Sequence, residues 1–437
     1  ASSQDFRTVY PKLNQYVNGE LGFLWNSVDS ADNYLLQIST SSTFSSLLQE
    51  IQSSQNGSTY SLPDSTSSYY WRVIARRGLN SLDTSRLSTF RTFTPKTLDS
   101  LNLWLRADSG ITLNGSKVSS WDDLSDSALV LNQSVASFQP DWEDSVINEF
   151  PALLFDFQDD AIDFSIGLQK KNYSISMVYS TSSTNRSRSI IQGTGWSMGP
   201  RLGIHSVNVG FPLAGPTVVL DRFVVHTALG LGDSLSNYVN DSLYARVSTT
   251  RNPGLNLKLG KRLDGYLAEV IMVDGLLPDS SRKALDNYLM DKYAPPINLG
   301  ADRRVCTFPD SVSIDIDYAL KYEWSTGDST STLVVNSGGK YYLSVTDRFG
   351  RLSVDSITFL ADTLDYSIDF GFTDTTICQG ESIALNAGNP LYSYSWNTGE
   401  TSPSIQVDSA GTYVVSVTNC KGGLSQDSVE LLISDPI

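Results

Sequence analysis

The chain has 437 residues, of which 40% are hydrophobic, 11% aromatic and 18% charged. This composition excludes an intrinsically disordered chain, and the length predicts three or four domains of ordinary size. The 31 Lys plus Arg against 47 Asp plus Glu give a formal charge of −16, which argues against nucleic acid as a partner because such a surface repels phosphates.

The first 95 residues contain short alternating apolar runs such as Leu21-Gly-Phe-Leu-Trp25 and Tyr69-Tyr-Trp-Arg-Val-Ile-Ala75, separated by Ser, Asn, Gly and Pro. Alternation of this length predicts an antiparallel β-sandwich. Residues 1–95 resemble a bacterial extracellular fibronectin type III domain in these runs and in Gln37-Ile-Ser-Thr-Ser-Ser-Thr-Phe44. Trp25, Tyr34 and Trp71 could stack on a sugar, but we expect them in the core, where aromatics dominate.

Residues 96–296 form the longest segment, with further alternating runs that predict strands. Near its end, Asp279 to Tyr293 changes to helical spacing, with Leu285, Tyr288 and Leu289 on one face and Pro295-Pro296 forbidding continuation. We expect Asp279 to cap this helix and the apolar stripe to pack on the outside of a sandwich.

The same segment resembles a concanavalin A-like, laminin-G-like jelly roll of large bacterial surface proteins. The resemblance is carried by Leu101-Asn-Leu-Trp-Leu-Arg-Ala-Asp108, Phe155-Asp-Phe-Gln-Asp-Asp160 and Asp264-Gly-Tyr-Leu-Ala-Glu-Val270 followed by the helix. It implies a fold more strongly than a function, because lectins, glycanases, adhesion modules and spacers share this architecture.

From about residue 298 the chain repeats itself at an offset of 72 residues, aligning Trp324 with Trp396 and Tyr341 with Tyr413. A register without gaps indicates two tandem copies of one module. The copies, residues 297–364 and 365–437, resemble immunoglobulin-like, PKD-like domains of secreted bacterial adhesins. The sequence thus predicts an all-β chain of tandem sandwiches around a central jelly roll that carries one short C-terminal helix.

The repeat also bears on the three cysteines. Cys378 and Cys420 begin and end one part of the second copy, whereas Arg348 stands in the first copy where Cys420 stands in the second. We therefore predict a Cys378–Cys420 disulfide and a free, buried Cys306, and a structural disulfide favours an oxidising, extracellular setting.

The sequence gives little support for a catalytic site. Related glycanases of this fold place acids at alternate positions of one strand, but the strand from Glu269 presents Ile271 and Val273 on the same face. The two histidines, His205 and His226, belong to no zinc or nucleophile motif. The chain is therefore expected to be non-catalytic.

Two candidate sites remain. The four acids Asp156, Asp159, Asp160 and Asp163 could supply oxygen ligands to a Ca²⁺ cofactor, although solvated turn acids are the plainer interpretation. Trp196, Arg201 and His205, in a Gly- and Pro-rich stretch, could face a sugar, although ordinary packing is again the plainer alternative.

We expect an extracellular segment of a large bacterial cell-surface adhesin, with the jelly roll recognising a surface glycan or protein and the flanking sandwiches acting as spacers in a semi-rigid rod. One alternative is a structural subunit of an extracellular filament that contacts copies of itself. A second alternative is a set of accessory modules of a secreted polysaccharide-degrading enzyme. No apolar run reaches the roughly 18 residues needed to cross a bilayer, and we expect the chain, which starts at Ala1, to be a piece of a longer exported protein.

Overall fold

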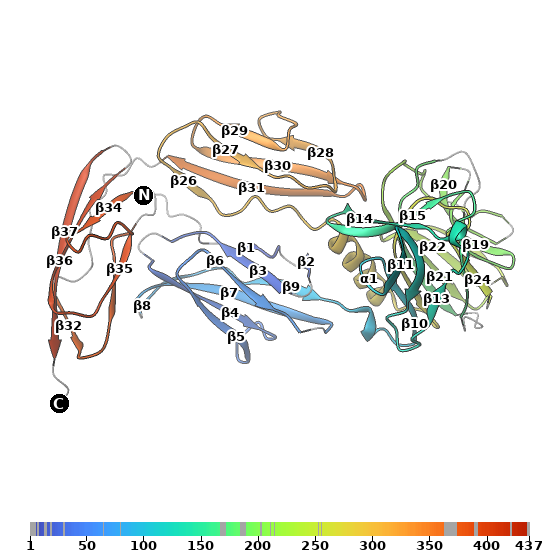
Figure 1. Cartoon of the computed structure of the whole chain (residues 1–437), viewed down its shortest axis with the longest axis horizontal. Helices are drawn as coiled ribbons and strands as arrows, with labels where there is room; N and C mark the ends of the chain where they lie inside the picture. The colour runs from blue at the N-terminus through green and yellow to red at the C-terminus, as the bar shows by residue number, and fades with distance from the viewer. Residues whose placement is uncertain are drawn as a thin grey trace.

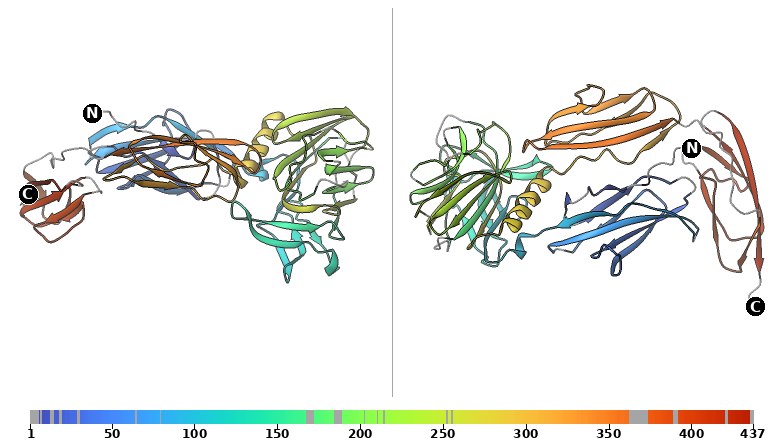
Figure 2. Two further views of the ribbon diagram at one scale, coloured as in Figure 1. Left: turned by 90° about the horizontal axis from the view of Figure 1, so that it is seen from above. Right: turned by 180° about the vertical axis from the view of Figure 1, so that it is seen from behind.

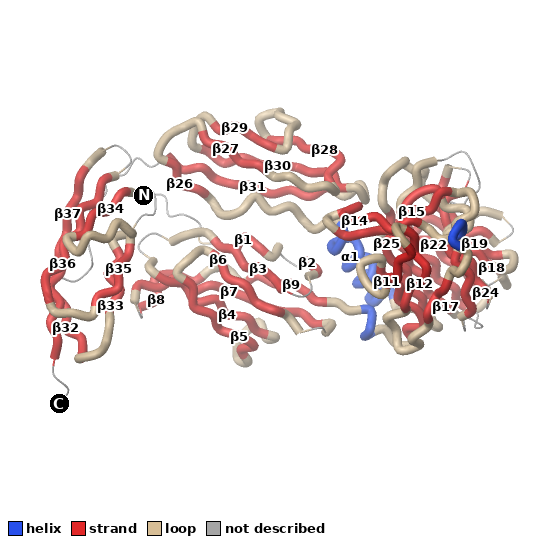
Figure 3. Tube along the Cα trace, in the orientation of Figure 1, coloured by secondary structure: helices blue, strands red, loops and turns tan. Residues whose placement is uncertain are grey.

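The computed structural model describes the chain except residues 1–5, 7, 13–14, 18–19, 29–30, 64, 79, 167–171, 184–188, 202, 210, 214, 252, 255, 362–373, 389–391, 420–421 and 435–437. The described part is nearly all β-strand, with a single α-helix and two short 3-10 helices, η1 (Pro95–Thr97) and η2 (Ala136–Phe138). Figure 3 shows this predominance of strands. The prediction of an all-β chain of sandwiches is therefore confirmed.

The N-terminal module consists of two packed sheets. One has the order β1 (Thr8–Tyr10), β3 (Glu20–Trp25), β6 (Gly57–Ser61); the other has the order β2 (Gln15–Tyr16), β9 (Ser88–Thr92), β7 (Ser67–Arg77), β4 (Asn33–Ser39), β5 (Leu47–Ser53), with β8 (Asn80–Thr84) beside β7. Burial alternates along β7, as the sequence pattern predicts. Trp25, Tyr34 and Trp71 are at most 3% exposed, so these aromatics are core residues.

The central module is a jelly roll of two facing sheets. Its larger sheet has the order β11 (Ile111–Asn114), β12 (Lys117–Asp122), β14 (Asp141–Ile147), β15 (Phe150–Asp156), β25 (Asp264–Val273), β17 (Tyr173–Tyr179), β21 (Val224–Leu231), β22 (Ser234–Val239), β23 (Ser242–Ser248), with β10 (Leu101–Arg106) beside β25 and β13 (Val130–Asn132) beside β12. Its smaller sheet has the order β16 (Ile162–Ser165), β24 (Asn256–Leu259), β18 (Ile191–Gly193), β19 (Trp196–Arg201), β20 (Ile204–Asn208).

The central strands of the larger sheet, β17 and β25, are buried on both faces. Along β25, Val270 and Met272 point into the core shared with the smaller sheet. The alternate residues Ile271 and Val273 point outward and pack with Leu289 of the helix. Successive side chains of a strand point to opposite faces of the sheet, so β25 contributes to two separate hydrophobic cores.

Helix α1 (Asp279–Tyr293) covers the outer face of the larger sheet, as its apolar stripe predicts. Asp279 is the first helical residue and not the cap, which is Pro278 without a side-chain hydrogen bond. The carboxylate of Asp279 instead pairs with Arg282 and Lys283 in the first turn. Among the described residues, no helix is long and apolar enough to span a membrane.

The C-terminal part contains two modules with the same strand arrangement. In the first, β26 (Arg303–Val305), β31 (Leu352–Ala361), β30 (Gly339–Asp347) and β28 (Ala319–Trp324) face the pair β27 (Asp310–Ser313) and β29 (Thr332–Val335). In the second, β32 (Asp374–Cys378), β37 (Leu424–Ser434), β36 (Gly411–Thr418) and β34 (Ser393–Trp396) face β33 (Ile383–Asn386) and β35 (Ser404–Val407).

The two copies also repeat individual hydrogen bonds. The indole Nε1 of Trp324 donates to the carbonyl oxygen of Thr330, and that of Trp396 donates to Ser402, both at 2.9 Å. These donors and acceptors lie at matching positions of the 72-residue repeat. The repeat that the sequence predicts therefore extends to the packing of its buried tryptophans.

The modules do not follow one another along a rod. Figures 1 and 2 show the N-terminal sandwich (blue) and the first C-terminal copy (orange) side by side, both on the α1 side of the jelly roll, with the second copy (red) at the far end. The expectation of spacers that flank the jelly roll in a rod is therefore wrong, because the chain folds back after α1.

The segment after α1 lies between these two sandwiches. Its Ile297 and Leu299 are at most 5% exposed, and the Leu299 backbone N–H donates to Asp355 in β31 at 2.8 Å. The N-terminal sandwich reaches the same region through an ion pair of 2.6 Å between Lys12 and Asp355. The proline-containing linker is thus a packed element and not an open hinge.

Two further contacts join the N-terminal sandwich to the rest of the structure. The Asn26 side chain donates to the Asp302 carboxylate at 3.0 Å, and its oxygen accepts the Asp302 backbone N–H at 3.1 Å. The backbone N–H of Tyr16 donates to Asp291 of α1 at 3.1 Å. The sandwich therefore contacts both the linker and the helix.

Candidate functional site

The β19–β20 hairpin carries all three residues of the predicted sugar-facing site, but the structure does not bring them together at a surface. Trp196 begins β19 and Arg201 ends it, so they lie roughly 16 Å apart along the strand. Trp196 is 1% exposed and His205 is 2% exposed. The prediction that they face a ligand is wrong, because both side chains point into the jelly-roll core.

Trp196 is held there by a specific contact. Its indole Nε1 donates to the hydroxyl of Tyr173 in β17 at 3.1 Å, and the two rings meet edge to face at 6.1 Å. Burial of that phenol raises the pKa of Tyr173 above its ordinary value. The Trp196–Tyr173 pair therefore joins the smaller sheet to the larger one. Arg201 is half-buried, and its Nε donates no hydrogen bond to any of the described residues.

His205 belongs to a buried polar network between the two sheets. The Tyr179 hydroxyl lies 2.7 Å from His205 Nδ1 and 3.1 Å from His226 Nδ1. His226 Nε2 lies 2.7 Å from the side-chain oxygen of Asn237, whose amide nitrogen lies 3.4 Å from the backbone oxygen of His205. The four residues therefore close a ring across the core.

Each hydrogen-bond donor in this network has an acceptor when both histidines are neutral. His226 donates through Nε2 to Asn237, so its Nδ1 accepts from Tyr179, and the Tyr179 oxygen accepts from His205 Nδ1. Burial lowers the pKa of His205 to about 3 and that of His226 to about 4. The network is structural, and its members are occupied with one another.

Glu269, the acid of the strand considered for glycanase chemistry, is fully buried on the outer face of the larger sheet. Its carboxylate accepts from Trp104 Nε1 at 2.7 Å and from the Tyr293 hydroxyl at 2.9 Å. It also pairs with Lys292 Nζ at 2.8 Å. Glu269 therefore anchors α1 to β25, a role that its position before two aliphatic residues did not reveal.

A second buried ionic group, which the sequence pattern did not predict, anchors the other end of α1. Arg282 is 1% exposed and pairs at 2.7 Å with both Asp286 and Asp241. Asp286 in turn accepts from the Thr227 hydroxyl of β21 at 2.8 Å. Burial is the main reason that the pKa of Asp286 is raised to about 7. The spacing of Arg282 and Asp286 by four residues was the available signal.

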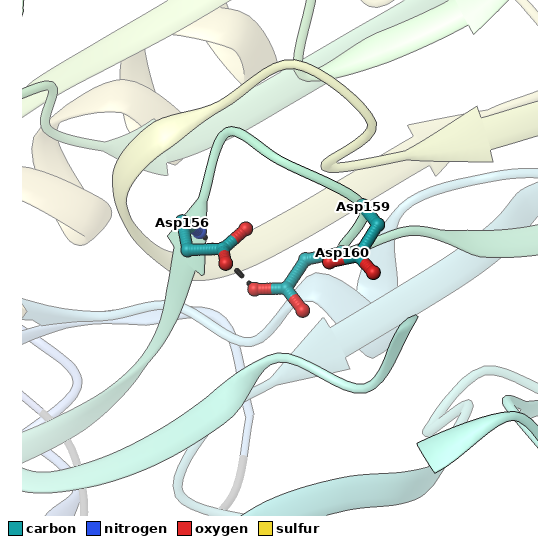
Figure 4. Close-up of side chains that lie close together, drawn as sticks. All are labelled: Asp156, Asp159 and Asp160. Atoms are coloured by element: carbon teal, nitrogen blue, oxygen red, sulfur yellow. Dashed lines mark hydrogen bonds between the residues drawn. The ribbon is translucent and has the colours of Figure 1, made fainter. Parts of the chain in front are cut away.

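Three of the four predicted cation-binding acids do meet. Asp156, at the end of β15, and Asp159 and Asp160, in the following loop, each offer a carboxylate oxygen, and these three oxygens lie within 4.8 Å of one another. Figure 4 shows Asp160 between the other two side chains in that view. Asp156 and Asp159 are exposed, whereas Asp160 is 3% exposed. Burial raises the pKa of Asp160 to about 6.

Asp163 is not part of this cluster. It lies in β16 and pairs with Lys258 of β24 at 2.9 Å. The four-acid site is therefore corrected to three acids, because the strand that begins at Ile162 carries Asp163 onto the outer face of the smaller sheet.

A cleft of about 420 Å³ lies where the first copy meets the linker. Pro295, Pro296 and Tyr318 contribute apolar surface, and Lys12 and Arg351 contribute the cations. Both cations are paired with carboxylates. The charged groups of the cleft therefore hold the modules together.

The cysteine prediction is corrected as well. Cys378 is a free, exposed thiol, so the predicted bridge to Cys420 is not formed. Cys306 is exposed and belongs to a disulfide, and hence it is neither free nor buried. Cys420 lies outside the described residues.

No protein-family model matches the sequence, and no curated protein matches it. Several solved structures are similar in fold to parts of the chain. Domain 4 of AbnA, a GH43 extracellular arabinanase from Geobacillus stearothermophilus in complex with arabinotriose, is 11% identical with a TM-score of 0.32, over 43% of this chain and 98% of that domain.

Two further solved structures show similarly low sequence identity and TM-score. The sialidase of Trypanosoma rangeli in complex with the inhibitor DANA is 10% identical with a TM-score of 0.34, over 51% of this chain and 43% of the sialidase. The binding domain of botulinum neurotoxin DC in complex with SialylT is 12% identical with a TM-score of 0.32, over 59% of this chain and 73% of that domain. The chain thus spans less than half of the sialidase, and similarity at this level assigns no function.

Proposed function

We propose that this chain is a non-catalytic, extracellular segment of a bacterial cell-surface adhesin, in which the jelly roll recognises a glycan or protein ligand. The observation that carries the proposal is the polar outer face of the smaller sheet. Besides Ile204, the face presents hydroxyls, amides and charged groups, among them Asp163, Ser165, Gln192, Ser197, Asn208, Asn256 and Lys258.

This face is turned away from the other modules. Helix α1 and both neighbouring sandwiches lie on the opposite side of the jelly roll (Figure 1). Cross-strand pairing places Gln192 and Asp163 on either side of Lys258. Neighbouring amide, carboxylate and ammonium groups on a rigid strand surface suit hydrogen bonding to the hydroxyls of a glycan or the polar groups of a protein.

The non-catalytic part of the proposal is supported by the acid of β25. Glu269 is buried against α1 and occupied by Trp104, Lys292 and Tyr293. A retaining glycosidase needs two carboxylates about 5 Å apart beside its substrate. Glu269 lies instead on the face opposite the jelly-roll interior.

The test is a glycan array and a surface-protein binding assay with the purified chain, followed by the Gln192→Ala/Lys258→Ala double variant. We expect saturable binding that the double variant weakens at least about tenfold, which corresponds to roughly 1.4 kcal/mol. Lys321→Ala, in an exposed pair on the first C-terminal copy, is the matched control and should bind normally.

Two outcomes would overturn the proposal. Hydrolysis of a polysaccharide by the purified chain would contradict the non-catalytic assignment. Ordered polymers in electron micrographs, with no ligand retained on either array, would favour the filament subunit instead.

A further inference from the structure

We propose that Asp156, Asp159 and Asp160 bind one divalent cation with the oxygen preference of Ca²⁺. The three carboxylates converge at the end of β15, with their offered oxygens within 4.8 Å of one another (Figure 4). Two oxygens on the same Ca²⁺, each bound at about 2.4 Å, can be separated by up to roughly 4.8 Å. The observed spacing is therefore compatible with a shared ion.

The second observation is an unsatisfied atom inside the cluster. The Asp160 side chain is almost completely buried, and its Oδ2 accepts the backbone N–H of Asp156 at 3.1 Å. Its other oxygen, Oδ1, is buried and accepts no hydrogen bond from the described residues. A buried carboxylate oxygen without a partner is costly, and a bound ion is one established way to satisfy it.

The nearby lysines are engaged elsewhere. Lys117 pairs with Asp141 at 3.2 Å, and Lys258 pairs with Asp163 at 2.9 Å. Among the described residues, no lysine or arginine forms an ion pair with these three carboxylates. The carboxylates therefore repel one another, and a divalent cation removes that repulsion.

Ligand number and geometry favour Ca²⁺ over Mg²⁺. Ca²⁺ accepts six to eight oxygens in a flexible arrangement, whereas Mg²⁺ demands a near-ideal octahedron at about 2.0–2.1 Å. Asp156 and Asp159 are exposed, so coordination positions that the protein leaves open face water. Such a partly open site on three carboxylates is expected to bind in the range of about 10⁻⁴–10⁻³ M.

The cation would join the two sheets of the jelly roll. Asp156 ends β15 of the larger sheet, and β16 of the smaller sheet begins at Ile162. The three acids therefore lie on the crossover between the sheets, and the ion stabilises the jelly roll by fixing this loop. This role is independent of any ligand on the outer face of the smaller sheet.

The experiment is isothermal titration of the full chain with CaCl₂, combined with thermal unfolding in CaCl₂ and in EDTA. We expect one saturable site and a higher melting temperature in Ca²⁺. Asp160→Asn keeps the size of the side chain but removes its charge, and it should weaken binding at least about tenfold and abolish the thermal shift.

Asp163→Asn is the matched control, because Asp163 lies three residues beyond Asp160 but pairs with Lys258. It should retain the binding and the thermal shift of the unchanged chain. If Asp160→Asn fails to fold, the exposed Asp159→Asn replaces it and should also weaken binding. Absence of saturable binding up to about 10 mM Ca²⁺, normal binding by both Asp160→Asn and Asp159→Asn, or an equal loss in Asp163→Asn would overturn the proposal.

Discussion

Glu269 and Lys292 illustrate how single buried charges join separate elements of this protein. Their side chains are 0% and 8% exposed, and they pair at 2.8 Å between β25 and α1. A buried pair adds little compared with two apolar residues of the same size, because desolvation offsets the attraction. Loss of Glu269 is different, since the buried Lys292 then keeps only its longer pair with Asp108, at 3.5 Å.

Replacement of Glu269 by Ala is therefore expected to lower the free energy of unfolding of the jelly roll by about 3–5 kcal/mol. The Glu269→Met/Lys292→Met double variant should recover much of that loss, because neither charge remains. Urea unfolding followed by tryptophan fluorescence measures both. Lys321→Ala, which removes an exposed pair, should cause no measurable change, and a double variant as unstable as Glu269→Ala would contradict the explanation.

The histidine network predicts a dependence of stability on pH. Burial lowers the pKa of His226 to about 4 in the folded chain, against about 6.5 in an unfolded chain. The unfolded state therefore binds protons that the folded state does not, so stability is fully present above about pH 6.5 and is lost as the pH falls toward about 4.

His226→Gln removes one of these titrating groups. Its free energy of unfolding should fall less steeply than that of the unchanged chain between about pH 6.5 and pH 5, by up to about 1.4 kcal/mol per pH unit. Asp286, with its raised pKa, acts in the opposite direction but is present in both proteins, so the comparison isolates the histidine. Equal slopes in urea unfolding at several pH values would contradict this prediction.

At the scale of elements, the turn between β30 and β31 distinguishes the two C-terminal copies. In the first copy, Phe349 is 5% exposed against the jelly roll, and its backbone oxygen accepts from the Asn240 side chain at 2.9 Å. Arg351 pairs with Asp291 of α1 and donates to the backbone oxygens of Met290 and Ala294. At the positions of Phe349 and Arg351, the second copy has Lys421 and Gly423. The first copy has therefore specialised this turn for docking.

Arg351→Ala is expected to weaken the contact between the first copy and the jelly roll by about 1.5–3 kcal/mol, because it removes charged hydrogen bonds to α1. Differential scanning calorimetry should show the first copy unfolding separately from the jelly roll. Leu352→Ala is the matched control, because Leu352 is the next residue and is 68% exposed. A single unchanged transition in Arg351→Ala would show that other contacts carry the docking.

At the scale of the whole molecule, the modules form a folded-back arrangement rather than a row. One hydrophobic cluster contains Phe93 from the N-terminal module, Tyr288 from α1, and Tyr318 and Phe349 from the first copy. Apolar contacts therefore cross the domain boundaries predicted at residues 95 and 296. Those boundaries stay predictions, but the units on either side of them are packed together.

The Lys12→Ala/Asn26→Ala double variant should loosen this arrangement, because it removes the contacts of the N-terminal sandwich with Asp355 and Asp302. We expect a larger radius of gyration in small-angle X-ray scattering. Leu47→Ala/Leu82→Ala, at exposed positions of the same sandwich, should leave the scattering unchanged. A scattering curve of an extended rod from the unchanged chain would contradict the folded-back arrangement itself.

Much of the fold could be predicted from short-range patterns, and most of the site could not. Alternation predicted the strands around Trp25 and Trp71, the repeat predicted equivalent roles for Trp324 and Trp396, and helical spacing predicted α1. The site predictions failed where the decisive partner is distant in the chain. The Trp196 indole meets its partner Tyr173 across the core, and β16 carries Asp163 onto the outer face of the smaller sheet, where it pairs with Lys258.

The sequence by itself determined the all-β architecture, the face of α1 that is buried and the equivalence of the two C-terminal copies, because each depends on periodicity or on repetition along the chain. Only the tertiary structure decided which polar residues are available to a ligand. His205 and Glu269 are occupied by residues from other strands and from α1, whereas Asp160 retains an oxygen that has no partner in the described part of the chain. The physical reason is that burial and pairing depend on contacts between distant segments.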